Sequence, residues 1–312
     1  MIRTSQPKVS IVMPVYNALP YLDEAIRSIY AQTYENWELI IVDDASTDGS
    51  WEFASKIEDS RVRLFRNDKN MKNSYTLNRA IALASGKYIA KMDADDVSFP
   101  ERIEKQIHYL LDHPQIDAVS CGLYRVDNEM NLITISRPPE SHKDIIRFIS
   151  LGLKFVFGPS FPFTDGCIVA KKEWFEKWNY DQNIPYAQDF DRNLRSHYTS
   201  VFANVSDPLY IYRRVGVTSS WFSQTKAVYY KLISLLRYGF KMSNLGMSFL
   251  SLLSLAMRPL FTYLTTLYVM FIRKNARAQA AERQTDLGED AKRIRQAIEV
   301  INKVTIPFAT GR

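Results

Sequence analysis

The feature that most constrains this chain is a regular alternation of short apolar runs and helical periods between residues 8 and 117. Four runs of buried type, the first two rich in β-branched residues, predict strands at 9–13, 37–42, 61–65 and 87–92. Apolar residues at helical spacing follow them. Strands that alternate with helices in this way form a parallel sheet with helices on both faces. The sequence therefore predicts an α/β fold with a mostly parallel central sheet.

Polar side chains follow three of these strands, at segments 14–17, 43–48 and 93–96. Ligands of such sheets bind at the carboxyl ends of the strands, where these segments should converge. Asp93 and Asp95 have the hard oxygen ligands that Mg²⁺ or Mn²⁺ prefers, Asp44 can accept a hydrogen bond from a base or ribose, and Tyr16 can stack on a base. Taken singly, they also fit a solvated turn, a helix cap and a core-edge tyrosine.

The chain changes character after residue 117. Residues 118–126 and 132–136 read as a strand pair, 151–166 as a loop, 188–197 as a helix and 209–214 as a strand. Further on, 229–240 predicts an aromatic-rich amphipathic helix, and a charged helix is expected near 290–304. No Gly-rich phosphate loop, metal-spaced histidines or GxSxG motif is present.

At this point the residues resemble glycosyltransferase family 2. The resemblance is carried by VSIVMPVYNALPYLDEAIRSIYAQTYENWELIIVDDASTDGS and by GKYIAKMDADD, and it extends over residues 7–215. It implies a GT-A fold with a catalytic domain at 1–220, divided into a nucleotide-sugar-binding half (1–117) and an acceptor half (118–220). It also implies inverting sugar transfer that uses Mn²⁺ or Mg²⁺.

The resemblance assigns roles in the donor half. Pro14 and Tyr16 match the segment that stacks on the nucleotide, and Asp44 matches the carboxylate that contacts the base. Asp93 matches the position beside ribose and metal, and Asp95 the principal metal ligand. Uracil is the base expected from family frequency, and loops 67–75 and 151–166 are expected to select the sugar.

In the acceptor half, Asp189 matches the catalytic base, with Gln188 in place of the usual Glu. A carboxylate there can remove the proton of the attacking hydroxyl, although a helix N-terminal acid favoured by the dipole is the plainer explanation. Arg213 matches a basic position near the diphosphate. The histidine often found two residues later is Val215 here, which argues against a histidine ligand to the metal.

The C-terminal region, 221–312, is predicted to be helical, basic and membrane-associating. Residues 200–312 hold 16 basic and 6 acidic side chains, and two apolar runs, 245–257 and 260–272, are separated by Arg258 and Pro259. Each run is shorter than the ~20 residues that span a bilayer. We therefore expect two helices in the plane of the membrane, with residues 229–274 on its surface and a chain cut after Ser223 that stays soluble. An apolar dimer interface or a cap on the core is the alternative.

Composition limits the cellular location and the partners that we expect. The net charge is +6, but a basic region that is also apolar suits an anionic membrane rather than nucleic acid. Two cysteines and no evident signal peptide favour the cytoplasmic face of the inner or plasma membrane. The leading hypothesis is sugar transfer to a lipid-linked or glycan acceptor in envelope polysaccharide assembly. The alternatives are transfer to polyprenyl phosphate and a non-catalytic nucleotide-binding or phospho-acceptor module.

Overall fold

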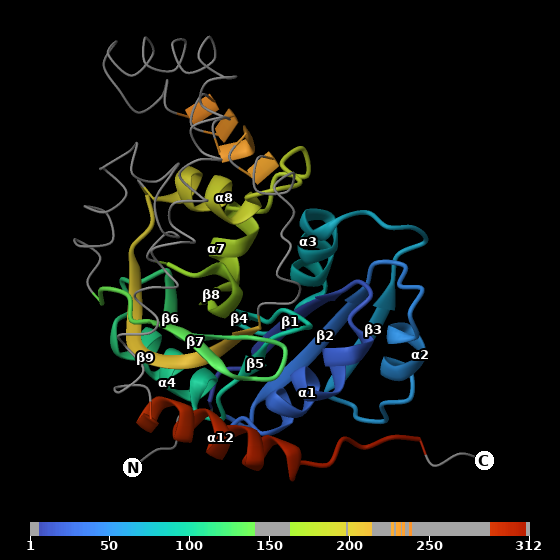
Figure 1. Ribbon diagram of the computed structural model, residues 1–312. Coiled ribbons are helices and arrows are strands. Elements are labelled where there is room, and N and C mark those ends of the chain that lie inside the picture. The colour runs from blue at the N-terminus through green and yellow to red at the C-terminus, as the bar shows by residue number, and fades with distance from the viewer. Residues whose placement is uncertain are drawn as a thin grey trace, which may run out of the picture.

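The computed structural model describes residues 6–140, 163–197, 199–213 and 288–309, with a few residues between 226 and 238. The nine strands of this part form one sheet in the order β3-β2-β1-β4-β8-β6-β9-β5, and β7 pairs with β6 (Figure 1). The strands are β1 (Val9–Val15), β2 (Trp37–Asp43), β3 (Val62–Arg66), β4 (Tyr88–Lys91), β5 (Val97–Ser98), β6 (Ala118–Val126), β7 (Leu132–Ser136), β8 (Val169–Lys171) and β9 (Phe202–Arg213).

The first half of the sheet follows the sequence prediction. Strands β3, β2, β1 and β4 are parallel to one another, which confirms the four predicted strands. The helices of this half are α1 (Leu19–Tyr30), α2 (Ser50–Ala54), α3 (Asn73–Leu83) and α4 (Arg102–Asp112).

The second half of the sheet corrects the prediction of a mostly parallel arrangement. Strand β8 is antiparallel to both β4 and β6, β5 is antiparallel to β9, and only β6 and β9 pair in parallel. Strand β7 must run against β6, because the turn between them is too short for a crossover. Here the elements are the 3-10 turn η1 (Asp165–Cys167), α7 (Lys172–Lys177) and α8 (Gln188–Ser196).

Two apolar cores cover the two faces of the sheet. Along β1, Val9, Ile11 and Met13 point into one core and Val12 into the other, as the two-residue period of a strand requires. Helices α1 and α4 pack on the first face, while α3, α7 and α8 pack on the second (Figure 1). This sandwich fixes the strand ends from which the candidate site is built.

The last described helix, α12 (Gly288–Asn302), lies beside α1, against the body built around the sheet (Figure 1). Its Ile294 and Ile301 are buried in the same core as α1, and the Tyr124 hydroxyl donates to Asp290 at 2.6 Å. A chain cut after Ser223 would lose this cover, so that truncation does not test membrane binding cleanly. The apolar runs 245–257 and 260–272 lie outside the described residues. Within the described part, no helix combines the length and apolarity needed to cross a bilayer.

Candidate active site

A pocket of about 510 Å³ opens between the turn that follows β4 and the first turn of α8. Asp93 and Asp95 line it from the turn, and Asp189 lines it from α8. Three carboxylates predicted from stretches of sequence about 95 residues apart therefore share one pocket. The other predicted residues lie outside the set that lines it.

The two carboxylates of the turn are electrostatically unlike ordinary surface acids. Burial raises the pKa of Asp95 to about 6, and the charge of Asp93 adds to the effect. Asp96 is buried behind them, where it accepts a hydrogen bond from the Arg213 backbone at 2.9 Å and leaves its second oxygen without a partner. Burial and its two acidic neighbours raise the pKa of Asp96 well above the ordinary range.

These residues fit a divalent cation that takes few protein ligands. Asp93 and Asp95 bring oxygen atoms into one pocket, and a cation there would offset the burial and the Asp93 charge that together raise the pKa of Asp95. Among the described residues, no group of three or more acidic, histidine or cysteine side chains forms a complete cage. The arrangement suits Mg²⁺ or Mn²⁺, which are commonly held by one or two carboxylates together with substrate phosphates.

Asp189 lies on the opposite wall. The chain enters α8 through Ala187, whose φ of 57° is uncommon for a residue other than glycine and turns Gln188 and Asp189 into the pocket. Although the Asp189 side chain is partly accessible to solvent, desolvation by the protein around it raises its pKa. The charge of the Asp165 carboxylate raises it further. A carboxyl group with a raised pKa and access to the pocket has the properties of a general base.

Asp44 does not line the pocket but holds the loop that leads to it. Buried at the end of β2, it accepts hydrogen bonds from the Asn67 side chain and from the backbone of Met71 and Lys72 at 2.7–2.9 Å. The next residue along, Asn73, lines the pocket. Asp44 therefore orders the loop predicted to select the sugar, and its contact with a base stays a prediction.

The remaining nucleotide-binding predictions concern the end of β1 and the end of β9. Pro14 is within β1, and Tyr16 beyond it has a side chain that is 51% exposed, as a stacking platform would require. Arg213, in contrast, is buried in an ion pair with Glu24 and lies over the ring of Tyr21 at 4.8 Å. The structure thus directs the Arg213 guanidinium toward α1, and contact with a diphosphate stays a prediction.

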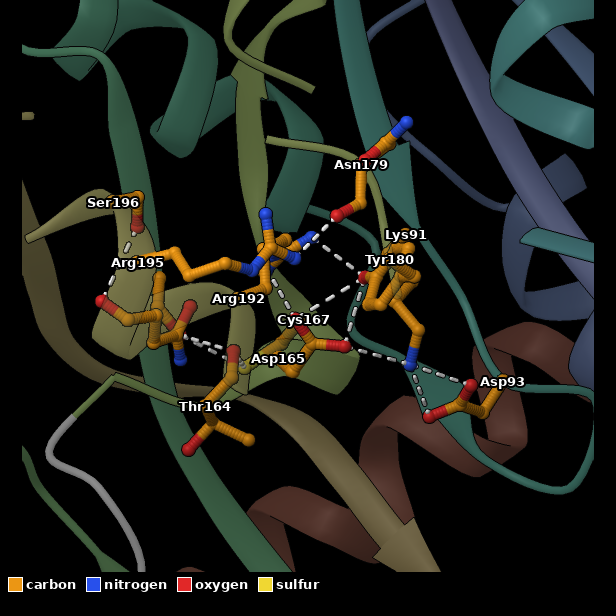
Figure 2. Close-up of polar contacts among 12 residues, drawn as sticks. Lys91, Asp93, Thr164, Asp165, Cys167, Asn179, Tyr180, Arg192, Arg195 and Ser196 are labelled. Carbon is orange, nitrogen blue, oxygen red and sulfur yellow. Dashed lines mark hydrogen bonds and ion pairs between the residues drawn. The ribbon is translucent and has the colours of Figure 1, made fainter. Parts of the chain in front are cut away.

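Sequence reasoning missed a buried ionic network beneath the pocket. Lys91 joins Asp93 to Asp165, and Arg192 of α8 pairs with Asp165 from the other side (Figure 2). Lys91 could have been noticed, since it lies two residues before Asp93 at the end of a predicted strand. Asp165 falls in a segment interpreted only as loop and carried no comparable signal. Arg125 of β6 also lines the pocket and was not predicted.

The family of this chain follows from a comparison with known protein families. The model of glycosyl transferase family 2 matches residues 10–178, more than half of the chain. The chain therefore belongs to this family of glycosyltransferases, which confirms the resemblance read from the sequence.

Relatives agree with the assignment, and a solved structure shares the fold. A glycosyltransferase of Haemophilus influenzae is 32% identical over 72% of this chain and 68% of its own length. UDP-Glc:alpha-D-GlcNAc-diphosphoundecaprenol beta-1,3-glucosyltransferase WfaP of Escherichia coli is 30% identical over 50% of this chain and 65% of its own. The mannosyltransferase PcManGT of Pyrobaculum calidifontis, solved with GDP-Man and Mn²⁺, covers 96% of this chain and 86% of its own, with 17% identity and a TM-score of 0.56. That likeness concerns the fold.

The sequence matches are partial. For the first four curated relatives, the matched segments cover 45% to 68% of the relatives' lengths. The family model places the match at residues 10–178 of this chain.

Proposed function

We propose that this protein transfers a sugar, with inversion, from a nucleotide-diphosphate sugar to a lipid-linked or glycan acceptor in envelope polysaccharide assembly. The observation that carries the proposal is the pocket of about 510 Å³ that joins Asp93 and Asp95 to Asp189. Its volume is in the range that holds small ligands, and its two acidic walls come from the two halves of the domain.

In this proposal Asp189 is the catalytic base. Its carboxylate accepts the proton of the acceptor hydroxyl as that oxygen attacks the anomeric carbon, and the bond to the diphosphate breaks on the opposite face of the sugar. The raised pKa of Asp189 strengthens it as a proton acceptor.

The donor would lie against the turn at Asp93 and Asp95, with Tyr16 and Asp44 toward the nucleoside. A divalent cation held by the turn would stabilise negative charge on the departing diphosphate. UDP is the proposed nucleotide, in line with the name of WfaP, whereas the GDP-Man of PcManGT keeps guanine as an outcome to test.

The experiment is turnover by the purified protein with Mn²⁺, a panel of UDP- and GDP-sugars and two acceptors. A diphosphate-linked polyprenyl sugar tests the proposal, and polyprenyl phosphate tests the alternative. Product in which the anomeric configuration is inverted, lost in Asp95→Ala and Asp189→Asn, would support the assignment. Nucleotide binding without turnover across the panel would contradict it and favour a non-catalytic module.

Association with a membrane through residues 229–274 belongs to the same proposal. It is supported by the basic, apolar sequence and by the position of α12. Arg213 ends β9 and Gly288 begins α12, and both elements belong to one body, so Arg213 and Gly288 would lie on the same side of a membrane. One crossing by the combined run 245–272 is incompatible with this, and each half is shorter than the ~20 residues of a span. Helices in the plane of the cytoplasmic face satisfy both conditions.

A further inference from the structure

Lys91 is a buried cation at the edge of the pocket. Its side chain is 5% exposed, and its ammonium donates to both oxygens of Asp93, at 2.8 and 3.0 Å (Figure 2). The same ammonium lies 3.4 Å from Asp165. One carboxylate of the acidic turn is thus already engaged on both oxygens by a cation of the protein itself.

Asp165, the second carboxylate beside Lys91, is also held in place. Asp165 is paired with Arg192 and accepts hydrogen bonds from the Tyr180 hydroxyl at 3.0 and 3.2 Å. Arg192 is fully buried and lies 4.5 Å from the centre of the Tyr180 ring. Because every partner is itself held in place, the Lys91 ammonium has little freedom to leave Asp93.

Asp95 differs from Asp93 in this respect, although both belong to the same turn. Within the part of the chain that the structure describes, no ion pair or side-chain hydrogen bond reaches the Asp95 carboxylate, which nevertheless faces the pocket. The turn therefore presents one neutralised carboxylate and one carboxylate open to a ligand.

We propose that Lys91 is a positioning residue that selects the metal ligand of the turn, because its ammonium occupies Asp93 and leaves Asp95 as the carboxylate for a divalent cation. This rests on the proposed metal-dependent function and differs from the sequence prediction, which gave Asp93 a share of the metal. An oxygen that accepts from an ammonium at 2.8 Å has less charge to offer a cation, and the ammonium repels that cation directly. The free protein then binds metal weakly, and substrate phosphates supply the missing ligands.

The test is Mn²⁺ binding to the full chain without nucleotide, measured from the free-Mn²⁺ signal in electron paramagnetic resonance. Lys91→Met frees Asp93 and is expected to tighten Mn²⁺ binding by about tenfold or more, the scale of outer-shell effects on metal affinity. Lys91→Arg keeps the cation and should bind like the wild type. Lys172→Met is the matched control: Lys172 donates to the Ala84 carbonyl at 2.8 Å and pairs with Glu176, away from the turn.

Two further variants keep the inference falsifiable if Lys91→Met does not fold, since removing one member of a buried ion pair is destabilising. Asp93→Asn should change Mn²⁺ affinity by no more than about twofold, because an engaged carboxylate contributes little, whereas Asp95→Asn should abolish binding. Adding Asp93→Asn to Lys91→Met should cancel the gain.

Two outcomes would overturn the inference, and a third would overturn the proposed metal site. Unchanged or weaker Mn²⁺ binding in folded Lys91→Met would overturn it, and so would equal losses in Asp93→Asn and Asp95→Asn. A wild-type protein that binds no Mn²⁺, even with UDP present, would instead overturn the proposed metal site, so the two failures are distinguishable.

Discussion

At the scale of single residues, Asp189 has two competing explanations that one experiment can separate. A catalytic base contributes about 10²- to 10⁴-fold to the rate, so Asp189→Asn should lower kcat by that factor and leave donor binding nearly unchanged. An acid that only favours the helix dipole would affect stability alone, by about 0.3–1 kcal/mol. Glu173, in the first turn of α7, is the matched control, and Glu173→Gln should leave kcat unaltered. Nucleotide release and thermal unfolding of both variants provide the readouts, and equal behaviour would remove Asp189 from the mechanism.

Glu38 predicts a pH dependence of stability at the opposite end of the sheet. Burial opposes its charge, but hydrogen bonds from Ser10 and Ser85 and the ammonium of Lys8 hold its pKa at about 2, below the ordinary 4.5. A lowered pKa stabilises the fold above pH 4.5, and this contribution is lost as the pH falls toward 2.

We therefore expect Glu38→Gln to lower the free energy of unfolding by about 2 kcal/mol at pH 7 and by progressively less as the solution becomes more acidic. Urea unfolding between pH 7 and pH 3 measures the difference. Glu299→Gln, on the exposed face of α12, should show a much smaller trend, because only its solvent-exposed pair with Lys303 lowers the pKa of that carboxyl. A deficit for Glu38→Gln that stays constant with pH would contradict the role of the charge.

At the scale of elements, α12 offers two adjacent residues with opposite environments. Ile301 is fully buried in the core beside α1, whereas Val300 is 50% exposed. Truncating the buried side chain should cost about 2–5 kcal/mol of unfolding free energy, and truncating the exposed one less than about 0.5. Chemical denaturation of Ile301→Ala and Val300→Ala measures both losses of unfolding free energy. Similar, small losses would mean that α12 detaches from the body in solution.

The same scale explains what the sequence could predict. The strands β1 to β4 and helix α8 were predictable because apolar spacing is a local signal, and the acidic turn followed from where β4 ends. Strands β5 and β8 have two and three residues, too few to show a period, so the mixed half of the sheet was missed. Lys91 and Asp165 meet only through long-range pairing of β4 with β8, which no local pattern reports. The packing of α12 on α1 is equally non-local.

At the scale of the whole molecule, segments near both ends of the described chain build one body. Residues 9–213 build the sheet, and α12 returns to cover the face that carries α1 and α4. Arg213 and Gly288 therefore both belong to this body. Part of the chain between them also lies against that body, because Ser234 donates to Asp191 at 2.8 Å and Arg237 pairs with Asp181.

This organisation makes the membrane proposal separable from folding. Replacing residues 241–287 with a flexible Gly/Ser linker keeps α12 in place, so the variant should unfold at nearly the temperature of the wild type. It should no longer sediment with vesicles that contain an anionic phospholipid, whereas the wild type should do so less as salt rises, because exposed charges are screened. Retained vesicle binding by the linker variant would show that residues 241–274 are not needed for membrane binding. A wild-type dimer that becomes a monomer in the variant, with no vesicle binding by either, would favour the apolar dimer interface instead.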